Sequence, residues 1–204
     1  MSSPALADYF SWEDSKSGLT LTFPDTWKVQ NNRHPDTILT IKAPSQNADP
    51  VCKVKAEDDG RYTIFPPQYG DVVQKDAVSI PFWESYLGHY DDYDIARVYD
   101  GGGLGRWVAS YATASYNERD GSILKSRRGI MFASLYYNTL YTVECSSLAH
   151  SYEDWARNFQ SVIKSIDFEK IYHLRRHGHY DDFLSDAEMN FWAQTGPEGT
   201  ISYN

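Results

Sequence analysis

The fold of this chain is decided by the segment Arg106–Phe168, which opens with RWVASYATASYN at residues 106–117. A second extended stretch, ILKSRRGIMFASLY, follows at residues 123–136. The link between them contains the pair Asp120-Gly121, which is a strong signal for a β-hairpin. A short turn then leads into TLYTVECSS at residues 139–147. These features predict three consecutive antiparallel strands.

The same segment ends in a predicted amphipathic helix over residues 152–166. Its large apolar side chains recur at i, i+4, i+7, i+8 and i+11, which places them on one face of a helix. These side chains are Trp155, Phe159, Val162, Ile163 and Ile166. Ser151 and Asp154 occupy the positions of an N-cap and its partner in the first turn. We therefore expect this helix to close the fold.

Shorter elements are expected in the first half of the chain. Alternation and turn residues predict strands at residues 18–23, 27–30, 37–43, 51–57 and 95–100, with a further extended piece at 61–65. Residues 71–87 predict a helix in which Pro81 lies near a start or a kink, and Gly88 suits the position after its end. The cluster Gly101–Gly105 lacks the Lys-Ser/Thr ending of a phosphate-binding loop, so we expect a flexible hairpin loop there.

The chain divides into three predicted parts. Residues 1–17 form an N-terminal arm that docks Trp12 against the core, residues 18–169 form the main domain, and residues 170–204 form a C-terminal extension. The extension starts with a basic, helical stretch, and from Gly178 onward it has five acidic residues and no Lys or Arg. The expected fold class is α+β, with a central antiparallel sheet flanked by helices and a C-terminal helical extension.

The charge balance narrows the classes of partner. Nineteen Lys and Arg stand against 28 Asp and Glu, which gives a net charge of −9 in 204 residues. Nucleic acid and anionic membrane surfaces require a basic face, so both are disfavoured, whereas a basic protein partner or a metal cation is compatible. No run approaches the ~18 apolar residues of a membrane span. The oligomeric state is left open.

Two cysteines bear on the compartment. Alternation along residues 51–57 and 140–146 puts Cys52 and Cys145 on the inward faces of their strands. If the strands are neighbours, a disulfide is feasible and fits an oxidising compartment; the alternative is two buried free thiols. Ala5-Leu6-Ala7 resembles the end of a secretory signal and equally fits an ordinary terminal segment. We expect a periplasmic or secreted protein, with a cytoplasmic one as the alternative.

A near repeat supplies candidate metal ligands. Gly88–Tyr93 reads GHYDDY and Gly178–Phe183 reads GHYDDF. Glycine fits a helix cap and the Asp pair fits the start of the next element, but neither explains His and Tyr. Imidazole with carboxylate suits Zn²⁺ or another transition-metal ion, and Ca²⁺ is the other possible cofactor; a solvated surface cluster is the competing interpretation. The candidate ligands are His89, Asp91, Asp92, His173, His177, His179 and Asp181.

Three motifs resemble the PsbP/MOG/DcrB-like superfamily. FPDTW at residues 23–27 is similar to the (F/Y)-P-x-x-W motif that follows its first strand, and YTV at residues 141–143 is similar to its last central strand. Residues 155–166 are similar to its closing helix and Ser-Ile exit. The resemblance covers roughly residues 18–168 and implies an αβα sandwich with binding or assembly work. Members include photosystem II extrinsic subunits, Ran-binding factors, periplasmic lipoproteins and secretion-system effector chaperones.

We therefore expect a non-catalytic binding or assembly protein that holds a protein partner through its sheet face or its C-terminal extension. The sequence has no G-x-S-x-G elbow, C-x-x-C pair or paired-carboxylate context for catalysis. Two alternatives stay open. One is a metal-binding protein or metal-dependent hydrolase that uses the His/Asp clusters. The other is a cytoplasmic secretion-effector chaperone that receives a hydrophobic helix from its client.

Overall fold

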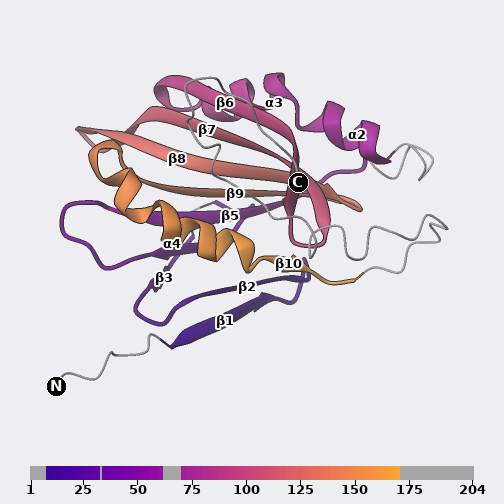
Figure 1. Ribbon diagram of the computed structural model, residues 1–204, viewed down its shortest axis with the longest axis horizontal. Coiled ribbons are helices and arrows are strands. Elements are labelled where there is room, and N and C mark those ends of the chain that lie inside the picture. The colour runs from indigo at the N-terminus through magenta and orange to yellow at the C-terminus, as the bar shows by residue number, and fades with distance from the viewer. Residues whose placement is uncertain (1–7, 33, 62–69, 171–204) are drawn as a thin grey trace, which may run out of the picture.

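The computed structural model describes residues 8–32, 34–61 and 70–170, in which ten strands form two antiparallel sheets (Figure 1). The larger sheet has the order β3 (Lys28–Gln30), β4 (Thr37–Lys42), β5 (Val51–Asp58), β9 (Thr139–Leu148), β8 (Ile123–Tyr136), β7 (Trp107–Asp120) and β6 (Asp91–Leu104). The smaller sheet has the order β1 (Tyr9–Asp14), β2 (Leu19–Pro24) and β10 (Asp167–Phe168).

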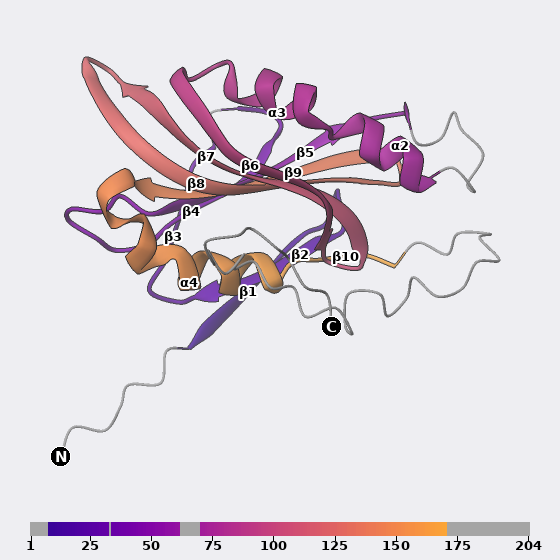
Figure 2. The same ribbon diagram turned by 45° about the horizontal axis from the view of Figure 1, so that its top comes forward.

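Helices lie on both faces of the larger sheet. α2 (Gly70–Ala77) and α3 (Ile80–Leu87) cover one face, and α4 (Tyr152–Lys164) lies with the smaller sheet on the other (Figure 2). The 3-10 turn η2 (Ala149–Ser151) leads into α4. The predicted α+β class, a central antiparallel sheet flanked by helices, is confirmed. In the described ranges, no helix combines the length and the apolar character needed to cross a membrane.

The predicted run of three antiparallel strands is confirmed. β7 and β8 pair up to Asp120↔Ile123, and the two-residue turn between them is Gly121-Ser122. Gly121 has a φ of +63°, which glycine adopts without steric cost. An added Cβ there would meet nothing within 4 Å, so the turn needs glycine for its backbone conformation and not for space. β8 and β9 continue the ladder through Tyr136↔Thr139.

The flexible loop predicted at Gly101–Gly105 is wrong. Gly102 and Gly103 belong to β6 and pair with β7, and only Gly105-Arg106 separates the two strands. A Cβ on Gly102 would lie 3.0 Å from Cδ1 of Tyr111. The glycine at this position therefore allows a close approach between neighbouring strands, which composition alone does not distinguish from loop flexibility.

Residues 71–87, predicted as one helix, form two. α2 ends at Ala77, and Pro81 lies in the first turn of α3, where a missing amide hydrogen bond costs little. Gly88 follows α3 as predicted, but its φ of −63° is right-handed, so it forms no left-handed cap. Most of the extended piece predicted at residues 61–65 lies outside the described ranges.

The helix predicted at residues 152–166 closes the core as expected. Its residues Phe159, Val162, Ile163 and Ile166 are buried. Trp155 is half-buried against Trp27, with ring centroids 6.2 Å apart. Ser151 precedes the helix, but its hydroxyl donates to the Leu148 carbonyl and caps no helix amide. The predicted capping box is therefore wrong.

The predicted N-terminal arm contains a strand. β1 pairs with β2 from Tyr9↔Pro24 to Asp14↔Leu19, and β10 pairs with the other side of β2. Trp12 is partly buried against the core, as expected. The predicted C-terminal extension lies outside the described residues except for Lys170.

Candidate functional site

A buried carboxylate stands at the centre of the larger sheet. Glu144 lies on β9, which is the middle strand, and its side chain faces α3. Alternation directs its neighbours Val143 and Cys145 to the opposite face, which α4 covers. Glu144 is 1% exposed. A charged side chain so far from solvent requires hydrogen-bonding or ionic partners.

Three tyrosine hydroxyls donate to this carboxylate. Tyr86 of α3 reaches Oε2 at 2.8 Å, and Tyr116 of β7 reaches Oε1 at 2.5 Å. Tyr90, between α3 and β6, lies 3.0 Å from both oxygens and stacks on Tyr116, with centroids 4.0 Å apart. Glu144, which lies on β9, therefore connects this strand to α3 and to β7. We call these four residues the tyrosine–glutamate cluster.

The sequence of α3 and β7 explains why the helix lies over the cluster. Trp83 of α3 is fully buried, and its indole N–H donates to the hydroxyl of Ser110 at 2.9 Å. Ser110, Ala112 and Ala114 share with Tyr116 the face of β7 that lies beneath α3. Their small side chains leave room for the indole ring and for the tyrosines.

The cluster keeps Glu144 ionised. Burial raises the pKa of Glu144, but the Lys53 ammonium and the three phenol donors outweigh it, so the pKa is lowered overall. Lys53 pairs in register with Glu144 and donates to Oε1 of Glu118 at 3.1 Å. Burial lowers the pKa of Lys53, but Glu144 and Glu118 raise it by more. The charges on β5 and β9 thus support each other's ionisation.

The same surroundings keep the phenols protonated. Burial and then the charge of Glu144 raise the pKa of Tyr86, Tyr90 and Tyr116. The two carboxylate oxygens receive four donor contacts from these hydroxyls, about as many as their lone pairs accommodate. This arrangement suits a fixed charge that anchors packed elements.

A second network of charged side chains is centred on Arg127 of β8. Arg127 is 1% exposed, and its guanidinium donates to Oδ2 of Asp49 at 2.9 Å and to the hydroxyl of Ser146 at 3.2 Å. Lys42 and Lys125 also pair with Asp49. Burial raises the pKa of Asp49, but Lys42 and Arg127 outweigh it and lower the pKa to about 2. This network ties the loop before β5 to the centre of the sheet.

The first GHYDDY copy contributes directly to the cluster. Tyr90 donates to Glu144, and the exposed His89 bonds through Nδ1 to the Tyr86 carbonyl. The rings of His89 and Tyr90 lie 3.9 Å apart. Burial lowers the pKa of His89. These contacts account for the His and Tyr that helix capping leaves unexplained.

The candidate metal ligands are only partly within the described residues. Asp91 pairs with Arg119 at 2.6 Å, and Asp92 is exposed at the start of β6. Across residues 8–32, 34–61 and 70–170, no three His, Cys, Asp or Glu side chains are grouped to hold a metal ion. The remaining candidates, His173, His177, His179 and Asp181, lie outside these ranges. A Zn²⁺ or Ca²⁺ site that unites the two copies stays a prediction.

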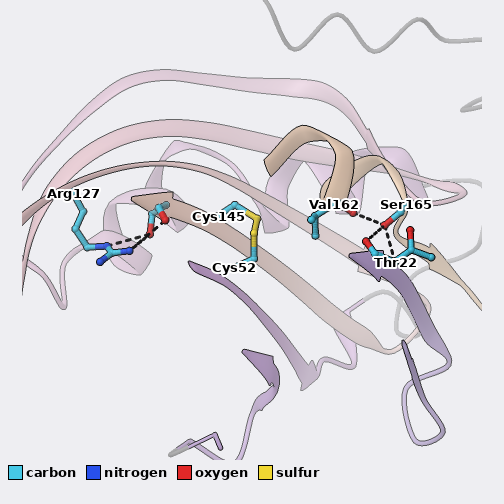
Figure 3. The surroundings of a disulfide bond; sticks show 7 residues. Thr22, Cys52, Arg127, Cys145, Val162 and Ser165 are labelled. Carbon is cyan, nitrogen blue, oxygen red and sulfur yellow. Dashed lines mark hydrogen bonds between the residues drawn. A yellow bond between two sulfur atoms is a disulfide. The ribbon is translucent and has the colours of Figure 1, made fainter. Parts of the chain in front are cut away.

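On the α4 side of the sheet, a disulfide joins β5 to β9 (Figure 3). Cys52 and Cys145 are register partners on these neighbouring strands, and both side chains are fully buried. The sequence leaves open whether these cysteines form a disulfide or are buried free thiols. In the structure they are bonded. Close to it, the Ser165 hydroxyl accepts the Thr22 N–H at 2.8 Å and ties the end of α4 to β2 (Figure 3).

Sequence reasoning missed the cluster and the part that Tyr86, Tyr90 and Tyr116 have in it. Alternation puts Lys53 and Glu144 opposite the cysteines, but it does not show that α2 and α3 cover that side. One signal was available. Glu144 is the only charged residue in TLYTVECSS, and a single charge amid apolar and hydroxyl side chains indicates a buried, partnered carboxylate.

Comparisons with known proteins bear on the fold. No protein-family model matches the sequence, and no curated protein matches it. Among solved structures, the chain is similar to cyanobacterial PsbP (CyanoP) from Synechocystis sp. PCC 6803, with 14% identity, a TM-score of 0.48, and coverage of 82% of this chain and 96% of that one.

A second solved structure is LpqN, described as involved in cell envelope biogenesis of Mycobacterium tuberculosis. The identity is 11%, the TM-score is 0.47, and the match covers 78% of this chain and 90% of that one. CyanoP and LpqN are thus among the solved structures that this chain is similar to. At these identities the likeness concerns the fold alone.

Proposed function

We propose that this protein is a non-catalytic binding or accessory protein that works in an oxidising compartment, periplasmic or extracellular, and holds a protein partner. The Cys52–Cys145 disulfide is the observation that carries the proposal. It links two central strands and is buried in the core. Disulfides persist outside the cytosol, where thiols are not kept reduced.

The tyrosine–glutamate cluster supports the non-catalytic part of the proposal. Catalytic carboxylates combine a shifted pKa with an open side that a substrate reaches. Glu144 has the first property, but its oxygens are occupied by Tyr86, Tyr90 and Tyr116. Its chemistry therefore serves the attachment of α3 to the sheet.

Exposed apolar side chains support a binding role. Tyr9 and Phe10 on β1, and Ile123 and Leu124 at the tip of the β7–β8 hairpin, are more than half exposed. Helices cover the central part of both faces of the larger sheet (Figure 2). A partner therefore contacts strand edges or hairpin tips, where large apolar side chains are available for burial. The other surface that the sequence predicts for a partner, the extension from residue 170, lies outside the described residues.

The test is cross-linking in intact cells of the source organism, followed by recovery of the full chain under non-reducing conditions. The control is an unrelated exported protein with the same tag. A protein recovered in a fixed ratio to this chain, and not with the control, is the expected result. Recovery of the chain without any such protein, at a cross-linker dose that captures a known complex, would contradict the proposal.

A further inference from the structure

We propose that β1 is a docking edge for an extended, basic segment of a protein partner, which adds to the smaller sheet as a further strand. The inference rests on the proposed binding function and specifies its surface and the chemistry of its partner. An edge strand presents a row of N–H and C=O groups that another chain can pair with. In the described part of the chain β1 pairs only with β2, and it forms an outer edge of the molecule (Figures 1 and 2).

The other edges are less suited to strand addition. The ladder of β6 is broken by register shifts at three places, and the strand carries four Asp and three Gly. Bulges and charges of this kind protect an edge strand from pairing. β3 has three residues and β10 has two. β1, in contrast, keeps a regular register over six residues.

The inward face of β1 is only partly covered. Phe10 lies against Phe23, with ring centroids 5.4 Å apart, yet Phe10 is 51% exposed while Phe23 is buried. On the outward face, Tyr9 is 62% exposed. A strand added beside β1 would place its side chains about 5 Å from these rings and bury them. The partner segment should therefore carry apolar residues at alternate positions.

The charges around β1 determine which charge a partner segment should carry. Residues 8–26 contain four acidic residues, Asp8, Glu13, Asp14 and Asp25, against the single basic residue Lys16. Pairing β1 with a second copy would bring like charges together in a chain of net charge −9. A basic segment of another protein fits this surface better than a second copy does.

The probe is a labelled synthetic peptide, KVKVKV, whose binding to the full, disulfide-bonded chain is measured by fluorescence anisotropy at low salt. Two matched peptides serve as controls: EVEVEV, and KVKVKV that is N-methylated at every residue, which has no backbone amide N–H left to donate to a ladder. We expect the KVKVKV peptide to bind and both controls to bind at least about tenfold more weakly. Equal binding of either control would overturn the proposal, as would a failure of KVKVKV to bind.

Protein variants locate the site. Glu13→Lys should weaken peptide binding by about tenfold, whereas Glu84→Lys, which reverses an exposed charge on α3, should leave it unchanged within about twofold. Equal losses in the two variants would overturn the assignment to β1. So would self-association of the wild-type chain that Phe10→Ala abolishes, because the occupant would then be a second copy. If a partner is recovered from cells but its binding is unaffected by Glu13→Lys, the docking edge is wrong and the proposed function stands.

Discussion

Replacing Glu144 by leucine tests whether the tyrosine–glutamate cluster holds α3 to the sheet. Leucine fills the site but offers no acceptor, so three tyrosine hydroxyls and the Lys53 ammonium lose their common partner. Removing one member of a buried charged network costs about 3–5 kcal/mol because the others stay buried without compensation. We expect the free energy of unfolding to fall by about 4 kcal/mol.

The measurement is urea unfolding at neutral pH, followed by circular dichroism with the disulfide intact. Glu84→Leu on the exposed face of α3 is the matched control and should change the free energy by less than about 0.5 kcal/mol. Glu144→Gln keeps one acceptor oxygen and should lose about 2–3 kcal/mol, which also gives a value if the leucine variant does not fold. Wild-type stability in both Glu144 variants would refute the anchoring role of the cluster.

Three further perturbations test other parts of the structure. Asp49 has a pKa lowered from 3.8 to about 2, so its stabilisation is present above pH 3.8 and is lost as the pH falls towards 2. Urea midpoints at stepped pH should show this loss in the wild type and not in Asp49→Asn; identical profiles would contradict it. Reducing the disulfide, which spans 93 residues, should lower the free energy of unfolding by about 2–5 kcal/mol, and equal urea midpoints with and without reductant would refute this. Gly102→Val places atoms against Tyr111 and should cost about 1–3 kcal/mol, so an unchanged melting temperature would show that the strands tolerate a side chain there.

The fold was predictable where the apolar residues follow a single periodicity, either that of a strand or that of a helix. The β7–β8 hairpin has extended stretches on both sides of Asp120-Gly121, and the buried face of α4 follows helical spacing over about three turns. Prediction failed where one residue type has two uses. Gly102 looks like a loop glycine but lies in a strand that passes close to Tyr111. Residues 71–87 look like one helix but form two, although Pro81 does lie near a helix start, as the sequence predicts.

The candidate site was less predictable because its contacts are distant in the chain. Tyr86 and Glu144 are 58 residues apart, and no local pattern indicates that α3 lies over β9. The repeat at Gly88–Tyr93 did draw attention to Tyr90, but imidazole and carboxylate chemistry pointed to a metal. In the structure, Tyr90 belongs to the cluster and the ring of His89 lies against it, while the metal site stays a prediction. Long-range packing determines such a site, and a single sequence does not encode it locally.

The proposal that this protein works in an oxidising compartment is tested most directly by the redox state of Cys52 and Cys145 in its own cells. Thiols are blocked with an alkylating reagent at the moment of lysis, the full chain is denatured, and its intact mass is measured before and after reduction. The expected result is that neither cysteine carries the reagent until the protein has been reduced and alkylated again. Alkylation of both cysteines in the unreduced sample would contradict the proposed location and the function that rests on it.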